Sequence, residues 1–278
     1  MSSQLTTGSA IRVMLDLPGG PIAALQAGSA DGRPALLVPG YTGSKEDFGP
    51  ILDPLAGAGY RVTAIDLPGQ YESPGRGDVA AYTVDALGAI VRAVAAQLGD
   101  RVHLLGHSFG GLVSRAAVIG DPAAFASLTL LSSGPAGLDG ARRARMERLR
   151  PVLVTHGIEA VYDAMEAFEQ AEPGHVARPE ALSDFLRRRF LAGDPAMLLG
   201  MGDALVNEPD RVDALIETGL ALLVVYGTDD DAWTPDMQAQ MAKRLGAAGV
   251  EIQTAAHSPA IDDPAGTVEA LVAFWRST

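Results

Sequence analysis

The chain has 278 residues, 47% of them hydrophobic, no cysteine, and a formal net charge of -13 at pH 7. This length fits one large α/β domain, or a domain with an insertion, and no apolar stretch is long enough to span a membrane. The charge disfavours nucleic acid and anionic membranes as partners, and the absence of cysteine excludes disulfides, a thiolate nucleophile and cysteine-ligated metals. The charge instead suits a neutral or cationic small-molecule substrate. The first ten residues are polar and resemble no secretory signal, so we expect a cytoplasmic protein.

Short apolar runs alternate with helical patterns through the first half of the chain. This alternation predicts an α/β fold with a mostly parallel sheet covered by helices. A helix is expected over 83–98, where apolar residues recur every three or four positions before Gly99. The expected strands lie at 11–15, 22–27, 35–38, 61–65 and 102–105.

The pattern changes after a further strand at 128–131. Residues 134–212 contain helix-like runs but no convincing strand, which predicts a helical lid inserted into a core formed by 1–133 and 213–278. The lid helices are expected to include the amphipathic stretch 158–168 and to begin again at Pro179 and at Asp194. The sheet is then predicted to resume at 220–226 and 250–254, with helices at 236–245 and 264–276.

A candidate nucleophile, Ser108, lies at the centre of a Gly-x-Ser-x-Gly sequence at 106–110. Such a pentapeptide can occur by chance in a glycine-rich chain, and a glycine-rich turn with an inert serine is the alternative. Here it directly follows the predicted strand 102–105 and opens the helix-like stretch 112–119, the context that a nucleophile elbow requires. The glycines allow strand and helix to approach, and the helix N-terminus directs free N–H groups at developing negative charge.

A serine hydroxyl needs a base, normally a histidine that a carboxylate holds in the correct tautomer. Of the five histidines, only His257 lies after the last predicted strand, in a loop at 255–259. The others have expected structural or surface positions: His103 in a strand, His107 in the elbow, and His156 and His175 in the lid.

The carboxylate is expected between serine and histidine in the chain, on the loop after the strand 220–226. That loop contains Asp229, Asp230 and Asp231, and such a run is often only a solvated turn. Asp230 is our choice, and Asp231 remains an alternative.

With these loops in this order, the chain resembles the α/β-hydrolase superfamily over nearly its whole length. The resemblance implies an eight-stranded, mostly parallel sheet flanked by helices, with an inserted helical lid. In that family the acid usually stands three residues after a glycine of the preceding strand. Gly227 occupies that glycine position here, so the resemblance implies that Asp230 is the acid. The proline that usually follows in the family is at position 235 here, one residue later than this spacing predicts. Asp231 therefore remains the alternative acid.

The resemblance also implies an oxyanion hole formed by the backbone amides of Tyr41 and Phe109. The turn at 39–43 carries Pro39 where the family usually has histidine, but the donor itself is main-chain. The loops at 66–70 and 257–260 are similar to family loops as well.

These residues predict a serine hydrolase that cleaves an ester-type bond through an acyl-enzyme, without a metal or other cofactor. A carboxylesterase or lactonase acting on a small apolar substrate is the first choice. Alternatives are a thioesterase or acyltransferase acting on carrier-bound acyl groups, and a non-catalytic ligand-binding member of the fold. The serine at position 108 argues against the epoxide hydrolase and dehalogenase branches, which have aspartate there.

Two further groups of residues are candidates for substrate or partner contacts. The first group is predicted to form an adaptable apolar pocket wall, although each side chain taken singly is more typical of a hydrophobic core. It comprises Met165, Phe168, Met197, Met201 and Trp233. The second group is a run of arginines that comprises Arg142, Arg143, Arg145, Arg148 and Arg150. It is either the solvent-exposed face of a lid helix or a docking surface for an acidic partner or carrier protein.

Overall fold

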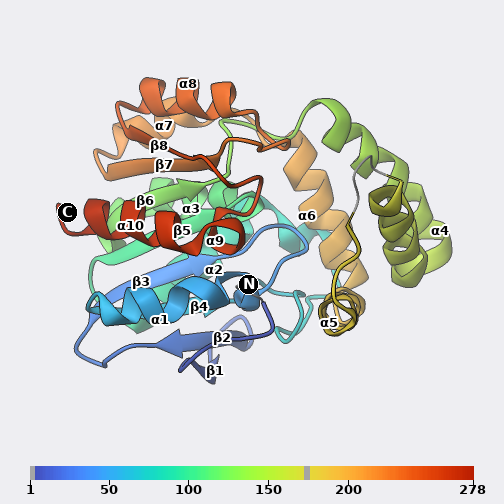
Figure 1. Cartoon of the computed structure of the whole chain (residues 1–278), viewed down its shortest axis with the longest axis horizontal. Helices are drawn as coiled ribbons and strands as arrows, with labels where there is room; N and C mark the ends of the chain where they lie inside the picture. The colour runs from blue at the N-terminus through green and yellow to red at the C-terminus, as the bar shows by residue number, and fades with distance from the viewer. Residues whose placement is uncertain (1–3, 172–175) are drawn as a thin grey trace.

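The computed structural model describes residues 4–171 and 176–278, so the expectations for residues 1–3 and for His175 lie outside the described part. The chain folds around one eight-stranded sheet with the strand order β1-β2-β4-β3-β5-β6-β7-β8 (Figure 1). The pairs β1–β2 and β2–β4 are antiparallel, and all other neighbouring pairs are parallel. The predicted α/β class and eight-stranded sheet are therefore confirmed.

Each predicted strand is present, with boundaries that move by a few residues. The largest shifts are at the strand expected over 128–131, which begins three residues earlier, and at the last strand, which begins and ends two residues earlier. The strands are β1 (Ile11–Leu15), β2 (Ile22–Ala27), β3 (Arg33–Val38), β4 (Tyr60–Ile65), β5 (Val102–His107), β6 (Phe125–Leu131), β7 (Ala221–Gly227) and β8 (Ala248–Ile252).

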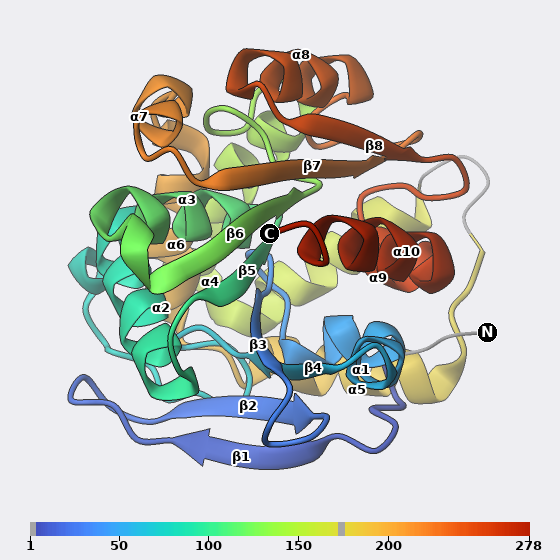
Figure 2. The same ribbon diagram turned by 90° about the vertical axis from the view of Figure 1, so that its left-hand side faces the viewer.

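Helices cover both faces of the sheet because its central strands are apolar on both sides, as in parallel sheets generally (Figure 2). One face packs against α1 (Gly49–Gly57), α9 (Pro259–Asp262) and α10 (Pro264–Trp275). The other face packs against α2 (Val84–Leu98), α3 (Phe109–Gly120), α7 (Val212–Glu217) and α8 (Pro235–Leu245). Short 3-10 turns complete the loops at η1 (Lys45–Phe48), η2 (Val79–Tyr82) and η3 (Pro122–Ala124).

Between β6 and β7 the described residues form helices and no strand. Three of these helices, α4 (Gly140–Gln170), α5 (Glu180–Leu191) and α6 (Pro195–Asn207), lie at one end of the sheet in Figure 1. Pro179 precedes α5, and the Asp194 side chain caps α6 by accepting a hydrogen bond from the Ala196 amide. No helix in residues 4–171 and 176–278 is both long and apolar enough to cross a membrane.

The helix expected over 158–168 is only the second part of α4, which starts at Gly140. The first part carries the arginine run that was expected on a lid helix, but its bounds were not predicted, because it is arginine-rich and largely solvent-facing and so lacks a clear apolar period. The helix is kinked at Gly157, whose φ of 82° is not helical, and this kink separates the two parts of α4.

Candidate active site

Ser108 lies at the sharp turn where β5 ends and α3 begins. Its φ of 54° and ψ of -122° place a non-glycine residue in a sparsely populated backbone region. Two backbone hydrogen bonds hold this conformation: the Ser108 amide donates to the Leu131 carbonyl, and its carbonyl accepts from the Gly111 amide, both at 2.9 Å. The strained turn therefore presents the hydroxyl at the end of the sheet.

The glycines on either side of Ser108 are required by close backbone contacts. A Cβ atom added to Gly106 would lie 2.3 Å from the Gly110 carbonyl oxygen. One added to Gly110 would lie 2.4 Å from the Val38 carbonyl oxygen. Both distances are shorter than packed atoms allow, so β3, β5 and α3 can meet at the elbow only through glycine.

Three side chains from distant loops form one hydrogen-bonded chain. Ser108 Oγ lies 2.9 Å from His257 Nε2, and His257 Nδ1 lies 2.9 Å from Asp230 Oδ1. Ser108 and Asp230 are buried, while His257 is partly exposed. The serine can donate to Nε2 while the Nδ1 hydrogen points at the carboxylate, which is the arrangement of a nucleophile, a general base and an orienting acid.

The carboxylate of Asp230 is held on both oxygens. Oδ1 also accepts from the Ala232 amide at 2.9 Å, and Oδ2 accepts from Gln238 Nε2 at 2.9 Å. Burial alone would raise the pKa of Asp230, but the hydrogen bonds from His257, Ala232 and Gln238 outweigh burial and keep that pKa below its usual value. This carboxylate is therefore ionised at neutral pH beside the imidazole.

Asp231 points elsewhere. Its side chain is 67% exposed and forms an ion pair with Arg142, with 3.0 Å between Oδ2 and Nε. Of the two aspartates that the sequence leaves open, Asp230 is the one that contacts His257.

His107, the variable residue of the elbow, supports the base from the side. Its Nε2 donates to the His257 carbonyl oxygen at 2.7 Å, which requires the tautomer with hydrogen on Nε2. Burial, and then the nearby His257, lower the pKa of His107 to about 4, so its ring stays neutral. The expectation that His107 packs at the elbow did not include this bond, since nothing in the sequence shows which carbonyl faces the ring.

The two amides predicted to form an oxyanion hole belong to residues close to Ser108. A Cβ atom on Gly40 would be 3.2 Å from Ser108 Cβ, so the turn carrying Tyr41 passes close to the serine. Among the described residues the Tyr41 amide donates no hydrogen bond. Phe109 is the first residue of α3, where an N–H group has no carbonyl partner within the helix. Both amides are thus free to bind an oxyanion.

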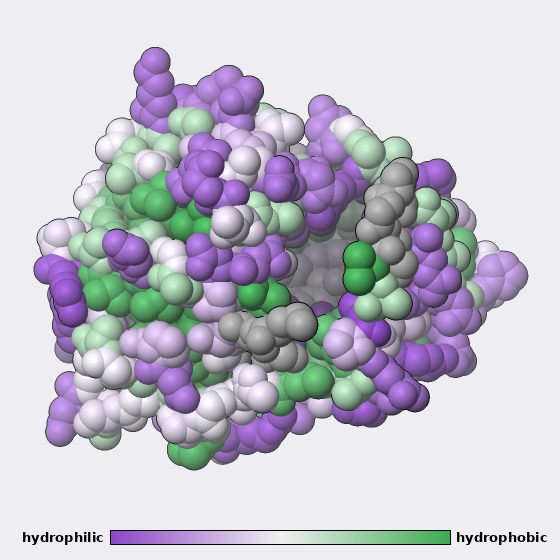
Figure 3. Space-filling model, in the orientation of Figure 1, coloured by the Kyte–Doolittle hydropathy of each residue, from purple (hydrophilic) through white to green (hydrophobic). Residues whose placement is uncertain are grey.

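A cavity of about 480 Å³ opens at Ser108 and His257, and Figure 3 shows a hollow between the sheet body and the inserted helices. A smaller apolar cavity of about 70 Å³ shares part of its wall with the larger one. We call the smaller cavity the apolar branch; the residues common to both walls are Tyr41, Thr42, Met146, Leu149, Met165 and Phe190. No group of side chains in the described ranges is arranged to hold a metal ion.

Of the five residues predicted for the pocket wall, Met165 lines both cavities, and the other four line neither. Met197 and Met201 are fully buried in the core, because the apolar stripe of α6 packs toward the sheet domain. Phe168 lies beneath the guanidinium groups of Arg145 and Arg148. Trp233 is buried behind His257, and its indole N–H donates to the Ala136 carbonyl oxygen.

The arginine run on α4 is largely engaged within the molecule. Arg142 pairs with Asp231, Arg143 with Glu147, and Arg150 with Asp203. The pair of Arg142 joins α4 to the loop that carries Asp230. These three arginines stay partly exposed in their ion pairs, with 33% of the Arg142 side chain and 54% of the Arg150 side chain accessible.

Comparison with known proteins places this site in a family. The profile of the alpha/beta hydrolase family matches residues 35–270. The chain belongs to this family. It is 30% identical over 228 residues to a pimeloyl-[acyl-carrier protein] methyl ester esterase of Aeromonas hydrophila, covering 80% of this chain and 87% of that one. A match to a Variovorax paradoxus protein, 38% identical over 106 residues, covers 38% of this chain and only 40% of the relative.

Solved structures share the fold of this alpha/beta hydrolase. The enol-lactonase of Burkholderia xenovorans LB400 aligns with a TM-score of 0.78 at 20% identity, over 95% of this chain and 100% of that one. An esterase from Exiguobacterium antarcticum aligns with a TM-score of 0.80 at 18% identity, over 96% and 100%. Family membership and these relatives indicate a hydrolytic enzyme.

Proposed function

We propose that the protein is a serine hydrolase that cleaves the ester bond of a small apolar substrate, open or cyclic, through an acyl-enzyme. The observation that carries this proposal is the hydrogen-bonded chain Ser108–His257–Asp230 at the floor of a cavity. A hydroxyl is a poor nucleophile near neutral pH, and this chain supplies the base and the orienting carboxylate that it lacks.

In the proposed acylation step, Ser108 Oγ attacks the ester carbonyl carbon while its proton passes to His257 Nε2. The carbonyl oxygen becomes an oxyanion, bound by the amides of Tyr41 and Phe109, and Asp230 stabilises the imidazolium. His257 then returns the proton to the leaving alkoxide as the carbon–oxygen bond breaks. In deacylation, water attacks the acyl carbon and gives its proton to His257, which passes it to Ser108 Oγ as the bond between Oγ and the acyl carbon breaks, and the free acid leaves.

The apolar branch supports a small apolar acyl group, whereas the larger cavity at Ser108 also carries charged side chains, among them Arg142, Arg145 and Glu166. The apolar branch adjoins the turn that carries Tyr41, so an acyl group directed into it would leave its carbonyl beside Ser108. The helices over this region belong to residues 134–212, and we propose that they act as a lid on a core of residues 1–133 and 213–278. The esterases and lactonase among similar proteins are consistent with this choice.

A fluorophosphonate probe tests the nucleophile. The wild type should be labelled at Ser108, and Ser108→Ala should lose both labelling and turnover of p-nitrophenyl esters. Ser114→Ala is a matched control, because it removes a buried hydroxyl without a hydrogen-bond partner from α3, the helix that Ser108 precedes. Labelling of Ser108→Ala at wild-type level would contradict the assignment, and absence of turnover and burst in the wild type would favour a non-catalytic ligand-binding protein.

A second candidate is a thioesterase or acyltransferase that acts on carrier-bound acyl groups. One observation favours a carrier-bound substrate, the Aeromonas relative whose name specifies a carrier-bound methyl ester; that bond is an oxygen ester, so the name does not itself favour thioester cleavage or acyl transfer. Rate measurements and product analysis separate it from the first candidate. Acyl-carrier substrates should be turned over faster than free esters, and the transferred acyl product should appear only when an alcohol or amine acceptor is added.

A further inference from the structure

We propose that Gln70 is a positioning residue that orients and strengthens one donor of the oxyanion hole, the backbone amide of Tyr41. The inference rests on the proposed function, since it concerns the same site. Gln70 lies in the loop after β4, is 1% exposed, and is separated from the nucleophile by the turn at 39–43.

The Gln70 side chain binds the peptide that contains this donor. Its Nε2 donates to the Gly40 carbonyl oxygen at 2.7 Å and to the Tyr41 carbonyl oxygen at 3.0 Å. The Gly40 carbonyl and the Tyr41 N–H belong to one planar peptide unit and point in opposite directions. Fixing the carbonyl on one side of the turn therefore fixes where the N–H points on the other.

The same bond changes the strength of the donor. A hydrogen bond accepted by a peptide carbonyl polarises the whole peptide group, so its N–H becomes a better donor, and such coupling is strongest away from water. With Gln70 buried, the Tyr41 amide is prepared for an oxyanion before substrate binds.

The orientation of the Gln70 amide is itself determined by its surroundings. Oε1 accepts from the Leu67 amide at 2.9 Å, while Nε2 faces two carbonyl oxygens. Rotating the amide by 180° would place a donor against a donor and an acceptor against two acceptors. Only this orientation lets the Gln70 amide bond all three main-chain groups; the Gly40 carbonyl oxygen also accepts from the Gly43 amide at 3.1 Å, within the same turn.

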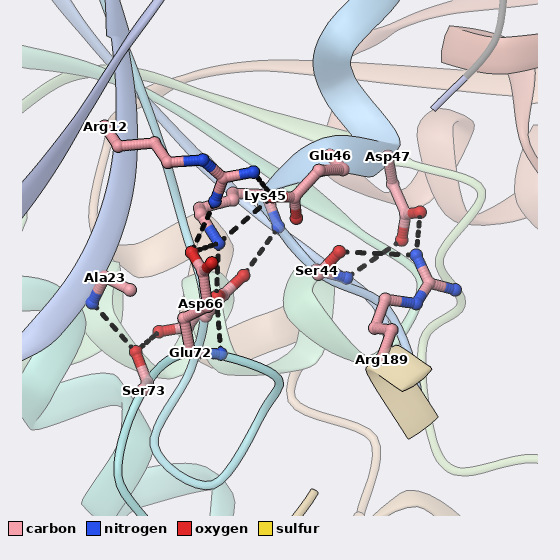
Figure 4. Close-up of polar contacts among 10 residues, drawn as sticks. All are labelled: Arg12, Ala23, Ser44, Lys45, Glu46, Asp47, Asp66, Glu72, Ser73 and Arg189. Carbon is pink, nitrogen blue, oxygen red and sulfur yellow. Dashed lines mark hydrogen bonds and ion pairs between the residues drawn. The ribbon is translucent and has the colours of Figure 1, made fainter. Parts of the chain in front are cut away.

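The loop that carries Gln70 is anchored by the polar cluster in Figure 4. Asp66 at its start accepts from Lys45 Nζ and from the Lys45 amide, both at 2.8 Å, and neither side chain is exposed. Ser73 at its end donates to the Asp66 carbonyl oxygen at 2.8 Å and accepts from the Ala23 amide on β2. Because Lys45 follows the turn at 39–43, the loop and the turn share one buried anchor.

The substitution Gln70→Met tests the inference, because methionine keeps the side-chain length but cannot donate. We expect kcat for a p-nitrophenyl ester to fall about ten- to hundredfold while KM changes by less than about threefold, a smaller loss than deleting a donor outright. Inhibition by a trifluoromethyl ketone, which forms a tetrahedral oxyanion on Ser108, should weaken by a similar factor. The corresponding secondary alcohol carries no oxyanion and should bind unchanged.

Two further variants exclude a merely structural role. Gln97→Met makes the same chemical change at an exposed amide that also donates to a main-chain carbonyl, and should match the wild type. In Gln70→Glu, a protonated carboxyl group regains one donor, so the activity relative to the wild type should rise as the pH is lowered. Loosening of the fold would not produce that pH dependence.

The outcomes separate this inference from the proposed function. If the wild type is active but Gln70→Met retains kcat and ketone affinity within about twofold, the inference alone is wrong. Equal weakening of ketone and alcohol binding would also overturn it, because the loss would then not depend on the oxyanion. If the wild type neither turns over esters nor binds the ketone, the proposed function fails, and the inference with it.

Discussion

Neighbouring aspartates in the loop after β7 have different environments. The carboxylate of Asp230 is enclosed by His257, Gln238 and the Ala232 amide, whereas that of Asp231 faces solvent and Arg142. The sequence could narrow the acid to this loop from chain order alone. A family spacing favoured Asp230, but Asp231 stayed open, because the directions of adjacent carboxylates depend on a turn whose geometry no local pattern specifies.

Replacing each aspartate by asparagine distinguishes their roles. Asp230→Asn should lower kcat by about 10⁴, because the amide no longer holds the imidazole in the productive tautomer. Asp231→Asn should change kcat/KM by less than about threefold, since it loses only an exposed ion pair. Steady-state hydrolysis of a p-nitrophenyl ester measures both, and comparable losses in the two variants would show that Asp230 is not the acid.

The sequence did not predict the residues that support the site through hydrogen bonds of neutral side chains. Ser108 and His257 are recognisable because their chemistry and chain order are characteristic of this kind of site. Gln70, Gln238 and His107 influence the site through contacts with a carboxylate or a main-chain carbonyl that the fold brings near. An amide or an imidazole at such positions looks the same in sequence as one at the surface.

At the scale of elements, the sheet was predicted best and α4 worst. Strands in the middle of the sheet, such as β7, appear as continuous apolar runs that end at a turn residue. Helix α4 combines an arginine-rich first part, Pro151 and the kink at Gly157, so it has no single period of 3.6. The burial that stabilises such a helix comes from contacts with α5 and α6, which local sequence does not report.

The elbow between β5 and α3 provides a test at this scale. Gly110→Ala should destabilise the fold by about 3 kcal/mol, the upper end of the usual range for overpacking, because the new Cβ meets two main-chain oxygens that cannot move aside. Gly57→Ala on α1 is the matched control: nothing lies within 4 Å of its Cβ, and alanine favours helix by up to about 1 kcal/mol. Urea unfolding measures both, and equal stability of the two variants would contradict the packing argument.

At the scale of the whole molecule, the last helix closes the core over the centre of the sheet. Trp275 of α10 is fully buried and stacks on His103 of β5, with 5.3 Å between ring centroids. Burial, with smaller contributions from Arg33 and Arg101, lowers the pKa of His103 from 6.5 to about 4. The strand position of His103 was predicted, but its partner lies at the other end of the chain.

This histidine makes global stability depend on pH. Between pH 6.5 and about 4 the unfolded chain binds a proton at His103 that the native protein does not, so the free energy of unfolding should decrease as the pH falls through this window. The contribution is up to about 3 kcal/mol. His103→Gln should reduce the slope of stability against pH, and His156→Gln is the matched control for loss of an imidazole. An unchanged slope in His103→Gln would show that another group dominates.

The inserted helices follow β6 and precede β7 in the sequence. These two strands are hydrogen-bonded neighbours in the sheet. None of Ser108, Asp230 and His257 lies between those strands, so the proposed catalytic residues and the proposed lid are separate stretches of polypeptide. A sequence exchange confined to this one segment would alter what the cavity admits while leaving the chemistry in place. The fold is therefore suited to modular engineering, in which substrate range is changed by grafting a related segment between two fixed attachment points.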